Sequence, residues 1–375
     1  MGVCPDARKT EGESFMDKKI YLEKEFSEQG VDCYTLKGKE YLNHYYIVSE
    51  SETRKLMNTP EIVGYEVYRC MLPATSQMMY YFKENGKVSC ANILSILRGA
   101  LNYPLEEACY REHVRIHDIS FLSSERVFNE EELAGLKIKY SKLTMVPDST
   151  LLIGDIIASG ETLIHCLKYV TDYYRASGAA LRNIILFTIG GTKAVDILER
   201  LTEEFRTFWP EFEGFYCVFY EGIFSTYQDK GVSGINIPDV DFFWKDGIIS
   251  PEFRRVTLSM RDPLFEKCII YDGGARRYEV HEHVDEVLGF WRDIRDRADL
   301  ISMKNLLDEK LGHETPITYE DWVEDCHYGH LNPSKTKWLY QQELGYIESL
   351  KKVDLREIAE ERIREFTDAL KKYII

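Results

Sequence analysis

The chain has 375 residues, a hydrophobic share of 44% and a formal net charge of −16, so it can bury one large core or two smaller ones. The acidic balance argues against non-specific binding to nucleic acid and to anionic membranes. Nine scattered cysteines without a Cys-x-x-Cys pair argue against a disulfide framework, and no apolar stretch reaches the roughly 18 residues of a membrane span. Because no signal-like segment follows the start either, the expected location is the cytoplasm.

The first fifty residues are interpreted as an N-terminal arm. Residues 1–30 mix charged and polar side chains, which predicts a loose arm or a short helix. Residues 41–48 (Tyr-Leu-Asn-His-Tyr-Tyr-Ile-Val) have the composition of a strand.

A helical segment follows and opens the main domain, which is expected to span residues 51–245. Apolar residues recur at intervals of mostly three, four and seven between positions 52 and 82, as on one face of a helix. Pro60 and Pro73 are expected to break this stretch into two or three helices, because proline removes a backbone donor.

Residues 88–97 predict a buried strand that runs into an anion site. The strand continues as Ser-Ile-Leu-Arg-Gly-Ala-Leu, so that Arg98 is followed by the small residues Gly99 and Ala100. A fixed positive charge then lies beside exposed backbone N–H groups, an arrangement that suits a diphosphate.

Two further strands are expected at residues 116–122 and 138–145, with a charged loop between them. In that loop, residues 123–136, Arg126 is the basic residue of interest among several glutamates. A solvated loop without a function is an equally good interpretation of its composition.

The segment from Ser149 to Leu163 is the centre of the chain. Its apolar run predicts a strand buried on both faces, and Asp155 lies at the carboxyl end of that run. The short turn Ala158-Ser159-Gly160-Glu161-Thr162 then leads into a helix. Free backbone N–H groups and a helix dipole would meet at this turn, which predicts a phosphate site, with Asp155 placed to bind hydroxyls of an attached sugar.

Strands are also expected at residues 183–189 and 215–220, with a helix at 194–201 between them. Strands that alternate with helices predict an α/β fold with a mainly parallel sheet flanked by helices. Ligands of such sheets bind outside the carboxyl ends of the strands, where Arg98 and Asp155 both fall. The two anion sites should therefore converge.

These motifs resemble those of the type I phosphoribosyltransferases. The apolar strand, acid and Ile-Ile-Ala-Ser-Gly-Glu-Thr turn look like their motif for phosphoribosyl pyrophosphate, in which the turn holds the 5′-phosphate and an acidic pair holds the ribose hydroxyls. Here Asp155 matches the second acid, and Gly154 stands where the first usually is. A generic strand-to-helix turn of another doubly wound fold is the alternative.

The closest branch by motif is that of the uracil phosphoribosyltransferases. Ile-Leu-Arg-Gly-Ala-Leu resembles its diphosphate loop, and Arg98 lies 57 residues before Asp155, about the interval of that family. The resemblance implies that a loop arginine closes over the diphosphate; Arg126 is the candidate, with Arg115 and Lys137 as substitutes. Gly-Ile-Asn-Ile-Pro at 234–238 is similar to the uracil-binding segment, which implies base contacts from Ile235, Asn236, Ile237 and Asp241.

The resemblance implies transfer of a phosphoribosyl group from phosphoribosyl pyrophosphate to a nucleobase or similar nitrogen acceptor, with Mg²⁺ and release of diphosphate. Arg98 would neutralise the leaving diphosphate and Asp155 would hold the ribose. Uracil is expected to be a poor acceptor, because Pro-Asp-Val-Asp replaces the family's glycine-rich segment after Pro238. A module of the same fold that binds a nucleotide or phosphosugar without turnover is the alternative function. A homo-oligomer is expected.

Residues 246–375 lie beyond the resemblance and are expected to form a mostly helical C-terminal extension. The clearest helix is predicted at residues 352–373, where the apolar residues fall on one side. Two groups of histidine, cysteine and acidic residues, at 281–285 and 326–330, are interpreted as surface residues of helices rather than as metal ligands.

Overall fold

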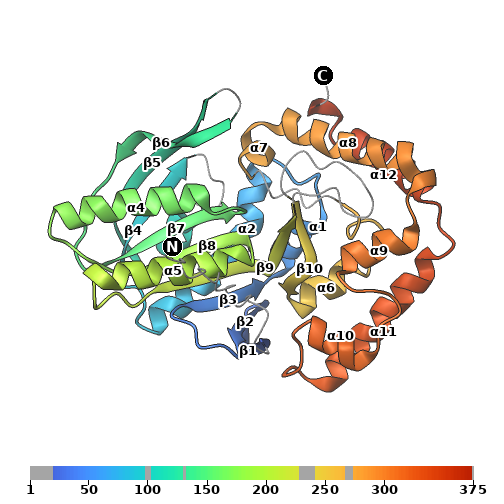
Figure 1. Ribbon diagram of the computed structural model, residues 1–375, viewed down its shortest axis with the longest axis horizontal. Coiled ribbons are helices and arrows are strands. Elements are labelled where there is room, and N and C mark those ends of the chain that lie inside the picture. Colours follow the sequence, from blue (N-terminus) through green and yellow to red (C-terminus); the bar gives the residue numbers. More distant parts are fainter. Residues whose placement is uncertain (1–19, 98–102, 130–131, 228–240, 267–272, 374–375) are drawn as a thin grey trace, which may run out of the picture.

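The computed structural model describes residues 20–97, 103–129, 132–227, 241–266 and 273–373, and Figure 1 shows a large central sheet with helices around it. The ten strands of the described residues are β1 (Tyr21–Glu28), β2 (Val31–Lys37), β3 (His44–Ser49), β4 (Cys90–Leu97), β5 (Arg115–Asn129), β6 (Glu132–Lys142), β7 (Ser149–Ile157), β8 (Leu181–Gly191), β9 (Phe215–Tyr227) and β10 (Asp241–Ile249). The helices associated with the central sheet are α1 (Ser51–Asn58), α2 (Tyr65–Glu84), α3 (Tyr103–Arg111), α4 (Glu161–Ala176) and α5 (Lys193–Phe208).

The sheet has a parallel centre and antiparallel margins. The strand order is β1-β2-β3-β9-β8-β7-β4-β5-β6, and β10 pairs with β9 off this path. The neighbours from β3 to β5 in this order are all parallel, whereas β1, β2, β6 and β10 pair antiparallel. The expected α/β fold is present, with a sheet that is partly antiparallel: at one margin a two-residue turn joins β1 to β2, whereas helices join the central strands.

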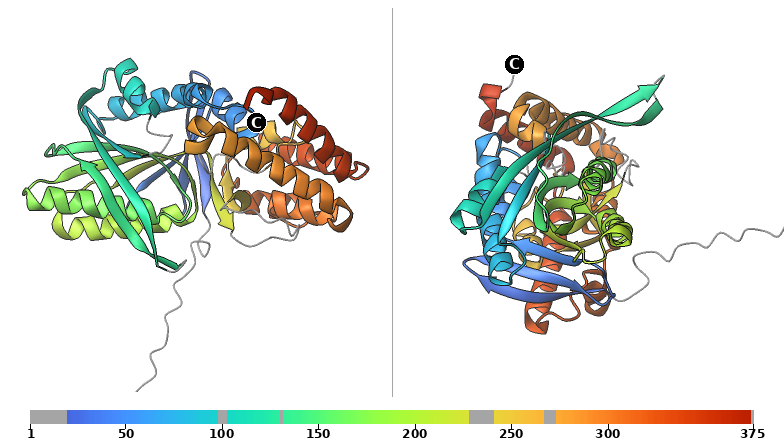
Figure 2. Two further views of the ribbon diagram at one scale, coloured as in Figure 1. Left: turned by 90° about the horizontal axis from the view of Figure 1, so that it is seen from above. Right: turned by 90° about the vertical axis from the view of Figure 1, so that its left-hand side faces the viewer.

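Helices cover both faces of the central strands. Leu152 of β7 packs in one apolar cluster with α2 and α3, whereas Leu151 and Ile153 pack in the other with α4 and α5. Side chains alternate along a strand, so each core strand supplies both clusters and forms a continuous apolar run. Figure 2 shows α4 and α5 end-on, across the sheet from α2.

Three expectations about local structure are wrong. Residues 21–37 form the hairpin β1–β2, not a loose arm or helix, because Leu22 and Leu36 bury their side chains against the sheet. Pro73 lies inside α2, where burial of most of the helix offsets the lost hydrogen bond. The segment 123–136 is not an open loop: β5 and β6 run through most of it as an antiparallel hairpin.

The C-terminal extension is helical, as expected. Its helices are α6 (Pro251–Thr257), α7 (Gly273–Tyr278), α8 (Val280–Arg297), α9 (Met303–Leu311), α10 (Tyr319–Asp325), α11 (Pro333–Leu350) and α12 (Leu355–Ala369), with short 3₁₀ turns at Ala298–Leu300 and Lys371–Tyr373. The predicted amphipathic helix is α12, whose buried residues include Ile358 and Phe366. They share one apolar cluster with Phe82 of α2 and Tyr220 of β9, so the extension packs directly on the main domain.

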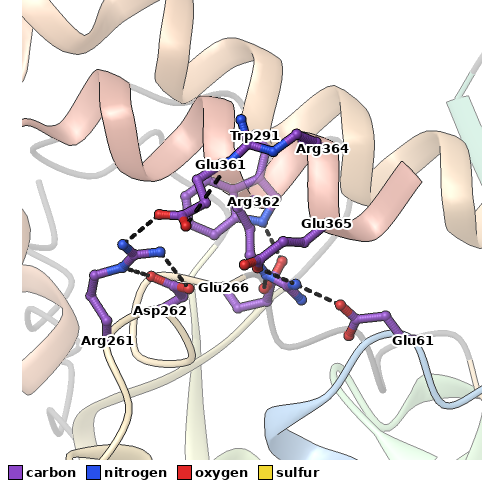
Figure 3. A network of polar contacts seen from close by, with 9 residues as sticks. All are labelled: Glu61, Arg261, Asp262, Glu266, Trp291, Glu361, Arg362, Arg364 and Glu365. Atoms are coloured by element: carbon purple, nitrogen blue, oxygen red, sulfur yellow. Dashed lines mark hydrogen bonds and ion pairs between the residues drawn. The ribbon is translucent and has the colours of Figure 1, made fainter. Parts of the chain in front are cut away.

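Buried polar contacts also tie the extension together (Figure 3). Arg362 of α12 forms ion pairs with Glu266 at 2.8 Å and with Glu61 at 2.5 Å, and Glu266 also accepts a hydrogen bond from the indole of Trp291. Burial raises the pKa of Glu266 to about 7, although the Arg362 guanidinium opposes the shift. The segments that carry Glu61 and Glu266 thus meet on one side chain of α12, and Trp291 joins them through Glu266.

Candidate functional site

The order of the parallel strands contains one reversal, and it lies between β4 and β7. The chain passes from β4 through α3 to β5 on one side, and from β7 through α4 to β8 on the other. The helix after β4 (α3) and the helix after β7 (α4) therefore lie on opposite faces of the sheet, since they belong to different apolar clusters. In open α/β sheets a ligand crevice forms at such a point, outside the carboxyl ends of the strands.

Asp155 lies in β7 at this reversal. It is two residues from Ile153 and from Ile157, both of which pack with α4 and α5, so its side chain is on that face. The carboxylate accepts a hydrogen bond from the backbone N–H of Ile156 at 2.9 Å. Burial raises the pKa of Asp155 to about 7, and this single backbone contact only partly opposes the shift. An acid held this way binds a hydroxyl or a cation readily, because binding restores partners lost on burial.

The turn after β7 leaves the start of α4 open. Gly160 is the N-cap residue of α4 with φ of +76°, and no side chain caps this end of the helix. The first intrahelical bond runs from the N–H of Ile164 to the carbonyl of Gly160 at 2.9 Å. The N–H groups of Glu161, Thr162 and Leu163 therefore precede the helical ladder, and the helix dipole adds partial positive charge there. This geometry suits a phosphate.

Glycine is required at position 160 for two reasons. Its positive φ is one that residues with a Cβ rarely adopt, and a Cβ built at this position would overlap Cδ1 of Ile197 in α5. The turn thus passes close to α5. Ser159 and Glu161 are exposed, and Ala158 and Thr162 are partly buried.

The other expected site residues fall at or beyond the limits of the described structure. Arg98 and Gly99 lie outside the described residues, directly after Leu97, the last residue of β4. Ile235, Asn236 and Ile237 also lie outside them. Two expected contacts have a described backbone only. Arg126 lies in β5 opposite Leu136 of β6, and Asp241 begins β10 opposite Tyr227 of β9.

Thr188 is a candidate that the sequence interpretation missed. It lies on β8 in register with Asp155, on the face that packs with α4 and α5. The side chain is fully buried, and its hydroxyl has no hydrogen-bond partner among the described residues. A lone threonine in the apolar run Asn-Ile-Ile-Leu-Phe-Thr-Ile was the available signal, since buried hydroxyls normally have partners.

The fold and this edge define an α/β protein with an uncapped helix start at a reversal of strand order. Similar solved structures include a protein from Aquifex aeolicus (15% identity, 46% of this chain and 85% of that one, TM-score 0.33). A hypoxanthine phosphoribosyltransferase from Staphylococcus aureus shows 13% identity over 41% of this chain and 75% of its own, with a TM-score of 0.27. A hypoxanthine-guanine phosphoribosyltransferase from L. donovani shows 14% identity over 36% and 78%, with a TM-score of 0.28.

No family model matches the chain, and no curated protein matches it. Among the residues that the structure describes, no helix is both long enough and apolar enough to span a membrane. Within the same residues, no group of three or more histidine, cysteine, aspartate or glutamate side chains is arranged to hold a metal ion.

Proposed function

We propose that this protein transfers a phosphoribosyl group from phosphoribosyl pyrophosphate to a nitrogen acceptor and releases diphosphate. One observation carries the proposal: Asp155 and the uncapped start of α4 belong to the same strand-turn-helix unit, and its strand, β7, lies next to β4. A sugar phosphate needs an anion site and a hydroxyl acceptor a few ångströms apart, and the strand-turn-helix unit supplies both.

In this proposal the turn at 158–162 anchors the 5′-phosphate through its backbone N–H groups and the hydroxyls of Ser159 and Thr162. Asp155 accepts hydrogen bonds from the ribose hydroxyls, and its charge favours the cationic character that develops at the anomeric carbon as the diphosphate leaves. Arg98, with Gly99, binds that diphosphate, and Arg126 approaches it from the β5–β6 hairpin. Binding energy at the 5′-phosphate then orients the reacting bond between the anomeric carbon and the diphosphate, several atoms away.

Mg²⁺ is part of the proposal because the leaving group is a diphosphate. The described residues form no all-protein metal cage, and Asp155 supplies one carboxylate at the crevice. That arrangement fits Mg²⁺, which is usually bound by one or two carboxylates together with substrate phosphates and water. When bound, the ion would neutralise charge on the leaving diphosphate.

The acceptor is a nucleobase or similar nitrogen compound other than uracil. Pro238 has no N–H to donate, and Asp239, Val240 and Asp241 carry side chains where the uracil branch has glycines. Residues 235–237 and Asp241 remain the proposed base contacts. Ala158 provides no general acid or base beside the acceptor.

A non-catalytic module that binds a nucleotide or phosphosugar is the second candidate. The observations that favour it are Gly154 in place of the first acid of the family's pair and the raised pKa of Asp155. A carboxyl with a pKa of about 7 is only partly charged at neutral pH, which weakens its support of a cationic transition state.

Ligand-induced stabilisation tests the site. Phosphoribosyl pyrophosphate with Mg²⁺ should raise the melting temperature, because a ligand bound only by the folded state adds stability. Asp155→Asn should reduce the shift and Thr162→Val should reduce it further, whereas the control Thr207→Val, at the far end of α5, should leave it unchanged. The absence of a shift in the wild type at millimolar ligand would refute the proposal.

Two measurements then separate the candidates and test the diphosphate contact. Release of diphosphate in the presence of a panel of bases indicates a transferase, and saturable binding without release indicates a binding module. Arg98→Ala should weaken the binding of phosphoribosyl pyrophosphate by about 1.5–3 kcal/mol. The binding of ribose 5-phosphate should be almost unaffected. Equal losses for both ligands would remove Arg98 from the site.

A further inference from the structure

A cavity lies between the N-terminal hairpin and the C-terminal extension, in the region of β1, β2 and α6 in Figure 1. Its volume is about 440 Å³, within the range of small-molecule sites. The lining comes from β1, β2, α6, the segment before α11 and α11 itself. It contains no residue of the crevice at β4 and β7, so binding in this cavity is independent of the proposed function.

The walls of this cavity are mainly apolar and aromatic. Tyr34 of β2 and Pro251 of α6 are buried, and Leu331 and Leu339 add aliphatic surface. Trp338 of α11 also lines the cavity although 55% of it is exposed. A large exposed indole beside a cavity is typical of a residue that gains contacts when a ligand binds, because its flat surface stacks on planar molecules.

The charged groups of the lining are mostly basic. Arg255 and Lys335 are exposed, and neither has an ion-pair or side-chain hydrogen-bond partner among the described residues. Lys24, also in the lining, is paired with Asp32 at 2.6 Å. Two cations without such partners in the lining of one cavity are notable in a chain with a net charge of −16, where acidic neighbours are plentiful. Their position favours an anionic occupant.

Glu252 is the acidic residue of the lining, and its surroundings reduce its effect. One carboxylate oxygen accepts a hydrogen bond from the Tyr34 hydroxyl at 2.8 Å, and the other is buried without a partner among the described residues. Burial, with a smaller contribution from Asp32, raises the pKa of Glu252. Arg255 and Lys335 therefore outweigh Glu252 among the charged groups that line the cavity.

We propose that this cavity binds a small planar aromatic molecule that carries a carboxylate. The ring lies against the indole of Trp338 and the aliphatic floor, and the carboxylate faces Arg255 and Lys335. The volume excludes a folded partner, and the two unpaired cations distinguish this occupant from a neutral aromatic compound.

The test uses the full chain labelled with 5-fluorotryptophan, which gives one fluorine signal for each of the five tryptophans. Trp338→Phe assigns the signal of interest. Addition of 2-naphthoate should shift the Trp338 signal saturably and leave those of the buried Trp291 and Trp322 unchanged. The neutral isostere 2-naphthamide should bind about tenfold more weakly, the loss expected for one charge-assisted contact.

Variants locate the carboxylate. The double variant Arg255→Gln, Lys335→Gln should lower the affinity for 2-naphthoate by about tenfold or more and leave the affinity for 2-naphthamide unchanged. Lys337→Gln is the matched control, because Lys337 is an exposed lysine of α11, the helix of Lys335, and lies outside the lining. This substitution should change neither affinity. Equal affinity for the acid and the amide, a shift outside Trp338, or no saturable shift at millimolar ligand would overturn the proposal. The comparison of the two ligands on the wild type decides it even where a variant fails to fold.

Discussion

At the scale of single residues, Asp155 combines a proposed binding role with an unfavourable position. Burial raises the pKa of its carboxyl from 3.8 to about 7, and the one backbone donor, the N–H of Ile156, only partly opposes this shift. The folded protein therefore holds a proton between these two pH values where the unfolded chain has released it. Stability contributed by this proton is present at low pH and is lost as the pH rises toward 7.

Asp155→Asn should consequently stabilise the ligand-free protein in neutral and alkaline solution. We expect a gain of about 1–2 kcal/mol at pH 8, less than the full shift implies because the side chain is partly exposed, and almost no gain near pH 4. Urea denaturation of both proteins at the two pH values measures it. A loss of stability at pH 8 would mean that Asp155 has a partner in the folded state that compensates its charge.

Gly160 should be sensitive to substitution in a way that another glycine in the same conformation is not. Gly160→Ala should cost about 1–2 kcal/mol for the positive φ, plus a smaller amount for the overlap with Ile197. Gly178→Ala is the control, because Gly178 has φ of +68° and nothing lies within 4 Å of its Cβ position. Thermal unfolding gives the two losses, and equal values would show that the overlap is relieved without cost.

At the scale of elements, α12 depends on one buried arginine. Arg362→Met would leave Glu266 buried without its cation, so we expect a loss of about 3–5 kcal/mol. Arg364→Met is the matched control: Arg364 is on the same helix, is exposed, and pairs with Glu361 at 4.0 Å, so its removal should change stability by less than about 1 kcal/mol. Urea denaturation compares them. Similar losses would mean that the network in Figure 3 adds little.

The sequence predicted the central elements well because each carries its own signal. The strand at 149–157 and helix α4 follow from an apolar run, a glycine turn and helical spacing, and all lie close together in the chain. The hairpin β1–β2 was missed because its outward side chains are charged and its inward ones, such as Leu22, are buried only by distant segments. The β5–β6 hairpin was missed for a related reason: its polar composition resembles a loop, and cross-strand pairing is not visible locally.

The candidate site was predicted in part. The positions of Asp155 and of Gly160 at the start of α4 follow from the local motif, and their common face follows from strand alternation. Thr188 is close to Asp155 only through the register of β8 against β7, which depends on tertiary pairing. The roles of Arg98, Arg126 and Asp241 stay predictions.

At the scale of the whole molecule, one apolar cluster spans the proposed boundary at residue 245. It joins Phe82 and Tyr220 of the main domain to Trp291 and Phe366 of the extension. Buried Glu221 of β9 adds polar contacts, since it accepts hydrogen bonds from the N–H of Glu50 at 3.0 Å and from Ser250, the N-cap residue of α6, at 3.2 Å. The extension therefore completes the core of the main domain.

Calorimetry of the full chain should show a single unfolding transition, because both parts lose the shared cluster together. A chain that ends at residue 245 should expose that cluster and be insoluble or bind hydrophobic dyes. Two separate transitions, or a soluble and cooperatively folded fragment, would show that the extension is an independent domain.

The hairpin that ends the sheet has a consequence for behaviour in concentrated solution. Strand β6 is one of the two strands that end the sheet path, so one side of its backbone has no neighbouring strand in the described fold. Exposed edges of this kind recruit strands from other molecules and start aggregates. Lys137, Lys139 and Lys142 of β6 are exposed, and a second copy of the edge would have to bring these like charges together, although Lys139 also pairs with Glu125 of β5 at 2.6 Å. The lysines thereby keep a long, open β-ribbon from becoming a template for fibres.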